Sequence, residues 1–173
     1  MPARRHIARV DHSDPLPWYY YPLIGRLFRR RLEMAAELLG NGPFQRILEV
    51  GYGSGILLPS LSQRAAAVFA VDLHRRTDLV ERMLRAEAAR AALAVGDVCR
   101  LGYADRAFDA VVCMSTLEHL SGAALQAAVD ELHRVLRPGG VAILGVPASG
   151  RLMDLLFRLI GFAEIGEHHV SAQ

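Results

Sequence analysis

The sequence predicts an α/β domain built on a mostly parallel, doubly wound β-sheet with helices on both faces. Three observations favour this fold class. Short apolar runs alternate with segments of helical periodicity, as in consecutive β–α–β units. The apolar runs, such as AVFAV at 67–71, lack polar–apolar alternation, which is expected for strands covered on both faces. The chain has 173 residues, of which 52% are hydrophobic, enough for one domain with a sizeable core.

Charge and cysteine content narrow the function classes. The 20 basic and 18 acidic residues give a net charge of +2, which argues against a dedicated nucleic-acid surface. Cys99 and Cys113 lack the spacing of a metal or redox pair, so we expect no metal site. The N-terminus lacks the apolar stretch of a signal peptide, and no apolar run could span a bilayer. We therefore expect a cytoplasmic protein without stable membrane insertion.

The N-terminal region divides into an arm and a helix. We assign residues 1–22 to the arm and expect its polar part, residues 1–17, to be loose. A helix is predicted over 23–39, because Gly40 can end it and apolar residues recur near helical spacing at Leu23, Leu27, Met34 and Leu38. Either a solvated face or a helix lying on a membrane surface explains its arginines, Arg26, Arg29, Arg30 and Arg31.

The stretch Ile47–Gly55, reading ILEVGYGSG, predicts a strand that breaks into a glycine-rich turn and reopens as a helix. Glycine lacks the Cβ that would hold a ligand away from the backbone. The helix behind the turn offers unpaired N–H groups to an anionic ligand end. An ordinary flexible turn is the alternative, but three glycines within five residues of a strand favour a ligand site.

The remaining elements alternate along the chain. Strands are predicted at 47–50, 67–71, 92–95, 109–114 and 141–146. Helices are predicted at 56–64, at 75–90, between the N-cap Ser121 and the Pro138-Gly139-Gly140 turn, and at 151–162. Their order indicates β–α–β units with right-handed crossovers.

Acidic residues end consecutive strands. Asp72 follows the second strand and Asp97 the third. Because ligands bind at the carboxyl ends of parallel strands, Asp72 is placed to accept both hydroxyls of a ribose and Asp97 to accept from the amine of a base. Each acid alone could be a helix N-cap, but their arrival at neighbouring strand ends favours a nucleoside site.

The chain resembles the class I S-adenosylmethionine-dependent methyltransferases, in the small-molecule branch called type 11. The matching stretches are ILEVGYGSG, AVDLH, VGDVCRLGYADRAFDAVVCMSTLEHL and HRVLRPGGVAILGVP, in order over about residues 45–147. The resemblance implies a Rossmann-like fold and a methyltransferase domain over 23–173. It also implies S-adenosylmethionine as cofactor and S-adenosylhomocysteine as product.

Site roles follow from the resemblance, position by position. The glycines let the backbone approach the methionyl part, and Glu49 holds that end of the cofactor. Asp72 takes the ribose hydroxyls and Asp97 the adenine amine. The full implied set is Glu49, Gly51, Tyr52, Gly53, Gly55, Asp72, Leu73, Asp97, Val98, Met114 and Ser115. Tyr52 departs from the pattern, since this position is usually small, and we expect its ring to narrow the turn.

The reaction that the resemblance implies is an in-line displacement at the sulfonium methyl group, which needs alignment and exclusion of water. A general base is needed only for a hydroxyl or protonated amine acceptor. His119 is the candidate by position, followed by His168 and His169, with a structural or exposed histidine as the alternative for each.

The acceptor is expected to be small or lipid-like. Methyltransferases of this fold that act on adenine or glutamine amino groups carry an Asn/Asp-Pro-Pro-aromatic motif where this chain has MSTLEHL, so we expect no nucleic-acid partner. The aromatic cluster at 18–21 and the 151–162 helix either roof an apolar pocket or complete the core.

The family sheet normally continues with an antiparallel pair of strands, which this sequence lacks, so we expect the domain to be C-terminally incomplete. The strand at 141–146 would then have a free edge, covered by a missing part of the protein, by a partner in an oligomer or by the 151–162 helix. Two rival functions stay open. A nicotinamide-dependent oxidoreductase requires Gly-x-Gly-x-x-Gly, but Ile56 stands at the sixth position. The second rival function is that of a non-catalytic binding protein of this fold.

Overall fold

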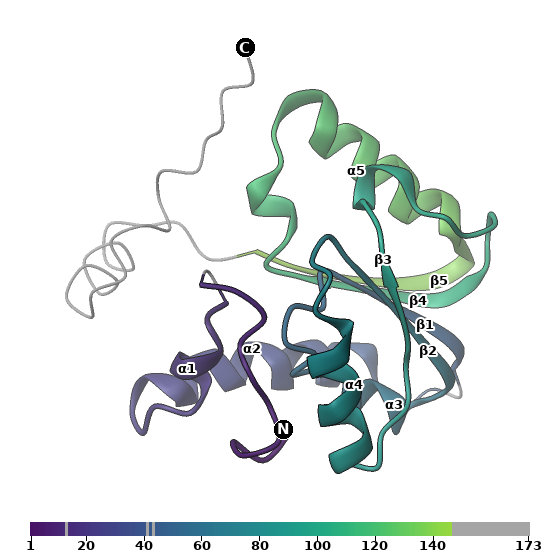
Figure 1. Cartoon of the computed structure of the whole chain (residues 1–173). Coiled ribbons are helices and arrows are strands. Elements are labelled where there is room, and N and C mark those ends of the chain that lie inside the picture. The colour runs from purple at the N-terminus through teal and green to yellow at the C-terminus, as the bar shows by residue number, and fades with distance from the viewer. Residues whose placement is uncertain (13, 41, 43, 147–173) are drawn as a thin grey trace.

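The computed structural model describes residues 1–12, 14–40, 42 and 44–146. Their secondary structure follows the predicted alternation of strands and helices (Figure 1). The helices are α1 (Leu16–Tyr19), α2 (Ile24–Leu39), α3 (Leu58–Ser62), α4 (Thr77–Ala86) and α5 (Gly122–Val135), with short 3₁₀ turns η1 (Val98–Arg100) and η2 (Leu117–His119). The strands are β1 (Phe44–Val50), β2 (Ala65–Asp72), β3 (Ala92–Val95), β4 (Phe108–Met114) and β5 (Leu136–Gly145).

The five strands form one parallel sheet in the order β3-β2-β1-β4-β5. The order reverses between β1 and β4, which is the switch point where ligands bind in such sheets. Within the described residues β5 is an edge strand and no antiparallel strand follows it. The predicted α/β class and the doubly wound sheet are therefore confirmed.

Helices cover both faces of the sheet. In Figure 1, α5 lies on one face and α1 to α4 lie on the other. The side chains of β1 alternate between the two layers: Ile47 packs into the core beneath α2 to α4, whereas Leu48 packs into the core beneath α5. This alternation explains why the strand sequences read as continuous apolar runs.

The N-terminal segment is packed, so the expectation of a loose arm over residues 1–17 is wrong. Ile7, Val10 and Leu16 are buried in the same core as the α2 to α4 layer. Asp14 fixes the turn before α1, because its carboxylate accepts from the backbone N–H groups of Val10 at 3.1 Å and Leu16 at 2.9 Å. The boundary between the arm and the domain stays a prediction.

Helix α2 begins and ends where its sequence pattern predicted, but its buried face is a different stripe. The buried side chains are Phe28, Leu32, Ala35, Ala36 and Leu39. The four apolar residues whose spacing predicted the helix, Leu23, Leu27, Met34 and Leu38, are exposed. The helix therefore has two apolar stripes, and the sheet takes only one of them.

Other elements differ from the prediction at their ends. Helices α3 and α4 are shorter than the predicted 56–64 and 75–90. Strand β5 is longer, because it begins at Leu136 and absorbs the Pro-Gly-Gly turn in an irregular register between Phe108 and Ala110 of β4. Ser121 is the N-cap of α5 in extended conformation but makes no side-chain capping bond. The predicted 151–162 helix, His168 and His169 lie outside the described residues.

Candidate functional site

The glycine turn after β1 uses its three glycines for different purposes, although Gly51, Gly53 and Gly55 all have positive φ. A Cβ on Gly51 would collide with Thr116, and a Cβ on Gly55 would lie 2.6 Å from Val80. These two glycines permit close packing inside the protein. A Cβ on Gly53 would meet nothing within 4 Å among the described residues. Gly53 is therefore the point where a ligand could approach the backbone.

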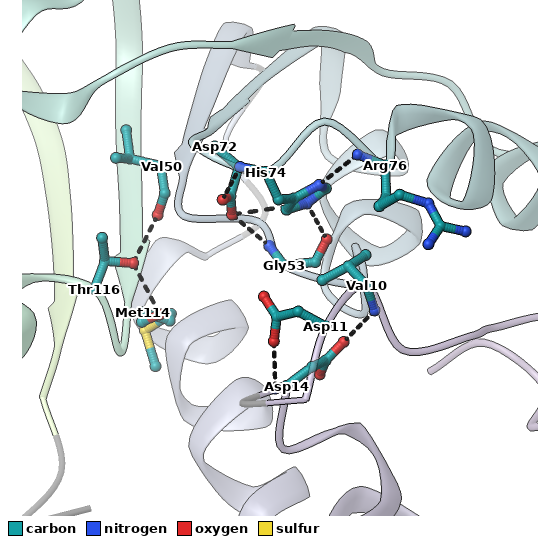
Figure 2. A network of polar contacts seen from close by, with 10 residues as sticks. All are labelled: Val10, Asp11, Asp14, Val50, Gly53, Asp72, His74, Arg76, Met114 and Thr116. Carbon is teal, nitrogen blue, oxygen red and sulfur yellow. Dashed lines mark hydrogen bonds and ion pairs between the residues drawn. The ribbon is translucent and has the colours of Figure 1, made fainter.

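Asp72 and His74 hold this turn in place, as Figure 2 shows. The N–H of Gly53 donates to Oδ2 of Asp72 at 2.8 Å, and Nε2 of His74 donates to the carbonyl of Gly53 at 2.9 Å. Nδ1 of His74 accepts from the N–H of Arg76 at 3.0 Å, which assigns the proton of the neutral ring to Nε2. Sequence reasoning missed His74, although its place two residues after Asp72 was a usable signal.

Glu49 is a buried carboxyl group at the end of β1. It is 4% exposed, and its Oε2 atom has no hydrogen-bond partner among the described residues. Burial, and secondarily the charge of Asp72, raises its pKa to about 8. The hydroxyl of Tyr52 and Oε2 of Glu118 are likewise buried without a partner in the part of the chain that the structure describes. A ligand that donates hydrogen bonds would satisfy such groups.

Tyr52 turns into the core instead of narrowing the turn. It is 3% exposed, and its ring meets the ring of His74 edge to face with centroids 4.9 Å apart. Burial, followed by the charges of Asp72 and Glu49, raises the pKa of its hydroxyl. The ring thus supports the turn from behind, and the expected narrowing is not observed.

Asp72 and Asp97 lie at the same edge of the sheet, since the N–H of Gly96 donates to the carbonyl of Asp72 at 2.9 Å. Asp97 caps η1 by accepting from the N–H of Cys99 at 2.8 Å, and Val98 beside it is buried. Leu73, the residue expected beside an adenine ring, is 71% exposed. The structure thus brings these predicted residues to neighbouring strand ends, while their ligand roles stay predictions.

The end of β4 forms the other side of the site. Ser115 has a φ of 58°, which is unusual for a residue with a side chain, and its N–H donates to the carbonyl of Gly145 at 2.7 Å. Nη2 of Arg31 on α2 donates to Oγ of Ser115 at 2.6 Å. Met114 packs against Gly145, and a hydrogen bond from Thr116 to the carbonyl of Val50 links this loop to the end of β1 (Figure 2).

Arg31 therefore reaches the site, which sequence reasoning missed. Its positive charge acts on Tyr19 and Glu118. Arg29 is also turned inward and donates to the carbonyl of Tyr19 at 2.6 Å. The four arginines of α2 are thus not one solvated face.

His119, the proposed base, is the last residue of η2 and is exposed. Its N–H donates to the carbonyl of Thr116 at 3.1 Å, so the ring is carried by the loop after β4. Of the aromatic residues expected to roof a pocket, Tyr19 packs on Phe28 and the hydroxyl of Tyr20 donates to the carbonyl of Pro2. These two rings complete the core, while Tyr21 is exposed.

Comparison with known proteins identifies the family. Residues 48–144 match the model of the methyltransferase domain. The chain is 32% identical over 135 residues to a ubiquinone biosynthesis O-methyltransferase of Alkalilimnicola ehrlichii, covering 76% of this chain and 53% of the relative. It is 37% identical over 139 residues to a demethylmenaquinone methyltransferase of Deinococcus radiodurans, covering 75% of this chain and 54% of the relative.

A solved structure shares the fold. It is the N-methyltransferase NodS of Bradyrhizobium japonicum in complex with S-adenosyl-L-homocysteine, with a TM-score of 0.64 at 21% identity, covering 79% of this chain and 68% of NodS. The chain spans about half the length of the curated relatives it matches. The family model, the relatives and the fold agree: this chain belongs to the class I S-adenosylmethionine-dependent methyltransferases, as the resemblance of its motifs implied.

Proposed function

We propose that this chain binds S-adenosylmethionine at the carboxyl ends of β1, β2, β3 and β4 and supports methyl transfer to a small or lipid-like acceptor. The carrying observation is the buried Glu49, with its unpartnered Oε2, next to the open backbone of Gly53. The cofactor has a cationic ammonium group at one end and a ribose with two hydroxyl donors in the middle. A buried acidic region beside open backbone fits these groups chemically.

The proposed roles follow from where each residue lies. Glu49 receives the ammonium group, Gly51, Gly53 and Gly55 shape the backbone around the methionyl part, and Tyr52 supports the turn. Each oxygen of Asp72 accepts one hydrogen bond from a backbone N–H, of Gly53 or of His74, and retains lone pairs for ribose hydroxyls. On the far side, Asp97, Leu73 and Val98 receive the adenine, and Met114 and Ser115 line the sulfonium side.

Arg31 is our addition to this set. Its guanidinium donates to Ser115, and its charge opposes the rise in pKa that burial causes at Tyr19 and Glu118. The methionyl carboxylate of the cofactor is the anionic group that such a cation would bind, because guanidinium groups bind carboxylates strongly. Glu49 and Arg31 would thus hold opposite charges of the same amino-acid end.

The bound cofactor would supply an electrophilic methyl group with a neutral thioether as leaving group. The residues of this chain would orient that group and exclude water. For a hydroxyl acceptor, His119 is the proposed general base, since it is carried on the loop after β4. The relatives are named for ubiquinone and demethylmenaquinone, which supports a small or lipid-like acceptor. An oligomer through the edge at 141–146 and a cytoplasmic setting also stay predictions.

Calorimetric titration with S-adenosylhomocysteine and, separately, NAD tests the proposal. We expect binding of the first and none of the second. Asp72→Ala should weaken binding at least about tenfold, because two hydroxyl contacts are lost. Binding of NAD alone would favour the oxidoreductase. Binding of S-adenosylhomocysteine without transfer to any quinol or phenol acceptor would favour the non-catalytic alternative.

Arg31 is tested with two ligands that differ in the amino-acid part. Arg31→Ala should weaken S-adenosylhomocysteine binding about tenfold or more. It should leave the affinity for 5′-methylthioadenosine, which lacks the carboxylate, unchanged. Arg30→Ala on the exposed side of α2 is the matched control and should change neither. An equal loss for both ligands would show that Arg31 only supports Ser115.

A further inference from the structure

An apolar stripe runs along the outer face of α2 and is not used by the core. We call Leu23, Leu27, Met34 and Leu38 the α2 stripe. Their exposed fractions are 81%, 45%, 46% and 69%. At 100° per residue they fall within an arc of about 60° and extend about 22 Å along the helix. Tyr21, next to the start of the stripe, is 56% exposed.

Single exposed apolar residues are ordinary on protein surfaces, but an aligned series marks an interaction site. The other side of the same helix already packs into the core through Phe28, Leu32, Ala35 and Leu39. The α2 stripe is therefore not needed to attach α2 to the sheet. Nothing among the described residues covers it, so it is available to a partner.

Charge along the first 31 residues of the chain indicates the nature of that partner. Residues 1–31 contain seven arginines and two aspartates, a net charge of +5, whereas the whole chain has a net charge of +2. The rest of the chain is therefore net negative, at −3. Arg26 and Arg30 are exposed next to Leu23 and Leu27, and Arg4, Arg5 and Arg9 are exposed on the N-terminal segment.

The two acidic residues of α2 lie toward its other end. Glu33 and Glu37 both pair with Arg30, at 3.8 Å and 2.7 Å. Arg29 and Arg31 are turned inward, so the exposed arginine of α2 outside these ion pairs among the described residues is Arg26, beside Leu23 and Leu27. A helix with an apolar stripe, flanking arginines and a nearby aromatic residue is the pattern of a segment that lies in the interface of an anionic bilayer.

We propose that the α2 stripe docks this protein on an anionic lipid surface. Leu23 and Leu27 enter the boundary between headgroups and acyl chains, and the exposed Arg26, together with the exposed arginines of the N-terminal segment, contacts the lipid phosphates. Among the described residues, none of the helices has the length and hydrophobicity of a membrane span. The inference does not depend on the proposed methyl transfer.

Co-sedimentation of the full chain with vesicles tests this proposal. One set of vesicles mixes phosphatidylglycerol with phosphatidylcholine, and the other contains phosphatidylcholine alone. We expect binding to the anionic vesicles that weakens as salt is raised. Leu23→Ser with Leu27→Ser should weaken it about tenfold or more, and Arg26→Gln should weaken it several-fold.

The matched control is Leu125→Ser with Val129→Ser, which removes two exposed apolar residues of α5 on the other face of the sheet. This control should bind anionic vesicles as the unmodified chain does. Absence of binding, equal binding to both kinds of vesicle, or an equal loss in the control would overturn the proposal. A dimer that the Leu23 and Leu27 substitutions dissociate, without vesicle binding, would overturn it in favour of a second copy. Titration of each variant with S-adenosylhomocysteine checks folding, and its failure in all samples would count only against the proposed function.

Discussion

At the residue scale, the buried Glu49 lowers the stability of the protein as pH rises but remains available to bind a ligand. The pKa of Glu49 is about 8 in the folded protein and 4.5 for a free side chain. The folded protein therefore keeps this proton up to a higher pH than the unfolded chain does. The folded state then binds more protons than the unfolded state between these values. Its contribution to the free energy of unfolding is therefore complete below pH 4.5 and is lost as pH rises through 8.

Glu49→Gln should remove this pH dependence. We expect the variant without ligand to be more stable than the parent at pH 8 by about 4 kcal/mol, and equally stable near pH 4. Urea unfolding at several pH values measures the difference. The same substitution should weaken S-adenosylhomocysteine binding, because the ammonium group loses its carboxylate. If the free energy of unfolding depends on pH in the same way in both proteins, the raised pKa of Glu49 is contradicted.

The glycine turn offers a second test at this scale. Gly55→Ala should lower the free energy of unfolding by about 3 kcal/mol, because the new Cβ would meet Val80 and Met83 in a backbone with φ of 77°. Gly53→Ala should cost only about 1 kcal/mol, since its surroundings are open. Its larger effect should be on cofactor affinity. Urea unfolding and ligand titration, run on both variants, separate packing from ligand approach.

At the element scale, α5 holds the loop after β3. Arg134 donates to the carbonyls of Leu101 at 3.0 Å and Tyr103 at 2.8 Å, and it pairs with Asp105 and Glu131. Glu131 in turn accepts from the N–H of Leu101 at 2.6 Å. This loop begins at Asp97 and Val98, the residues proposed to receive the adenine. Helix α5, on one face of the sheet, thereby fixes the loop at the carboxyl end of β3.

Arg134→Ala should release that loop. We expect faster amide hydrogen exchange at Leu101 and its neighbours and weaker binding of adenosine, while the strands keep their protection. Arg82→Ala is the matched control, because Arg82 pairs with the exposed Asp78 on α4. Unchanged exchange at Leu101 in the Arg134 variant would show that the backbone alone holds the loop.

At the scale of the whole molecule, the N-terminal segment packs against the helical layer that covers one face of the sheet. Its backbone and side chains are tied to α4 through Glu87, which accepts from the N–H of Ala3 at 2.7 Å and from His6 at 2.6 Å. These bonds lower the pKa of Glu87. Burial of Ile7 and Val10 adds an apolar contribution to the same contact.

Removal of residues 1–12 should therefore lower the free energy of unfolding by about 3 kcal/mol or more, from the two apolar side chains alone. Urea unfolding of the full and shortened chains measures the loss. The control is a double substitution of exposed residues in the same segment, Arg4→Gln with Arg5→Gln, which should change little. If the shortened chain is as stable as the full chain, the prediction fails and the N-terminal segment behaves as a loose arm.

Much of the fold was predictable because its signals are local. Five strands, the glycine turn and the acids at Asp72 and Asp97 stand in the sequence as contiguous patterns. The buried face of α2 was not predictable, because its two apolar stripes have similar spacing and only packing distinguishes them. His74 and Arg31 were missed for a related reason: their partners, Gly53 and Ser115, lie 21 and 84 residues away.

The sequence by itself determined the order of the elements, the point where the backbone bends after β1 and the family to which the chain belongs, because propensity and motif depend on neighbours along the chain. The tertiary structure alone decided which helix face is buried, that the N-terminal segment is packed and that Arg31 reaches Ser115 at the end of β4. Those outcomes depend on contacts between distant segments, whose free energies no local pattern contains.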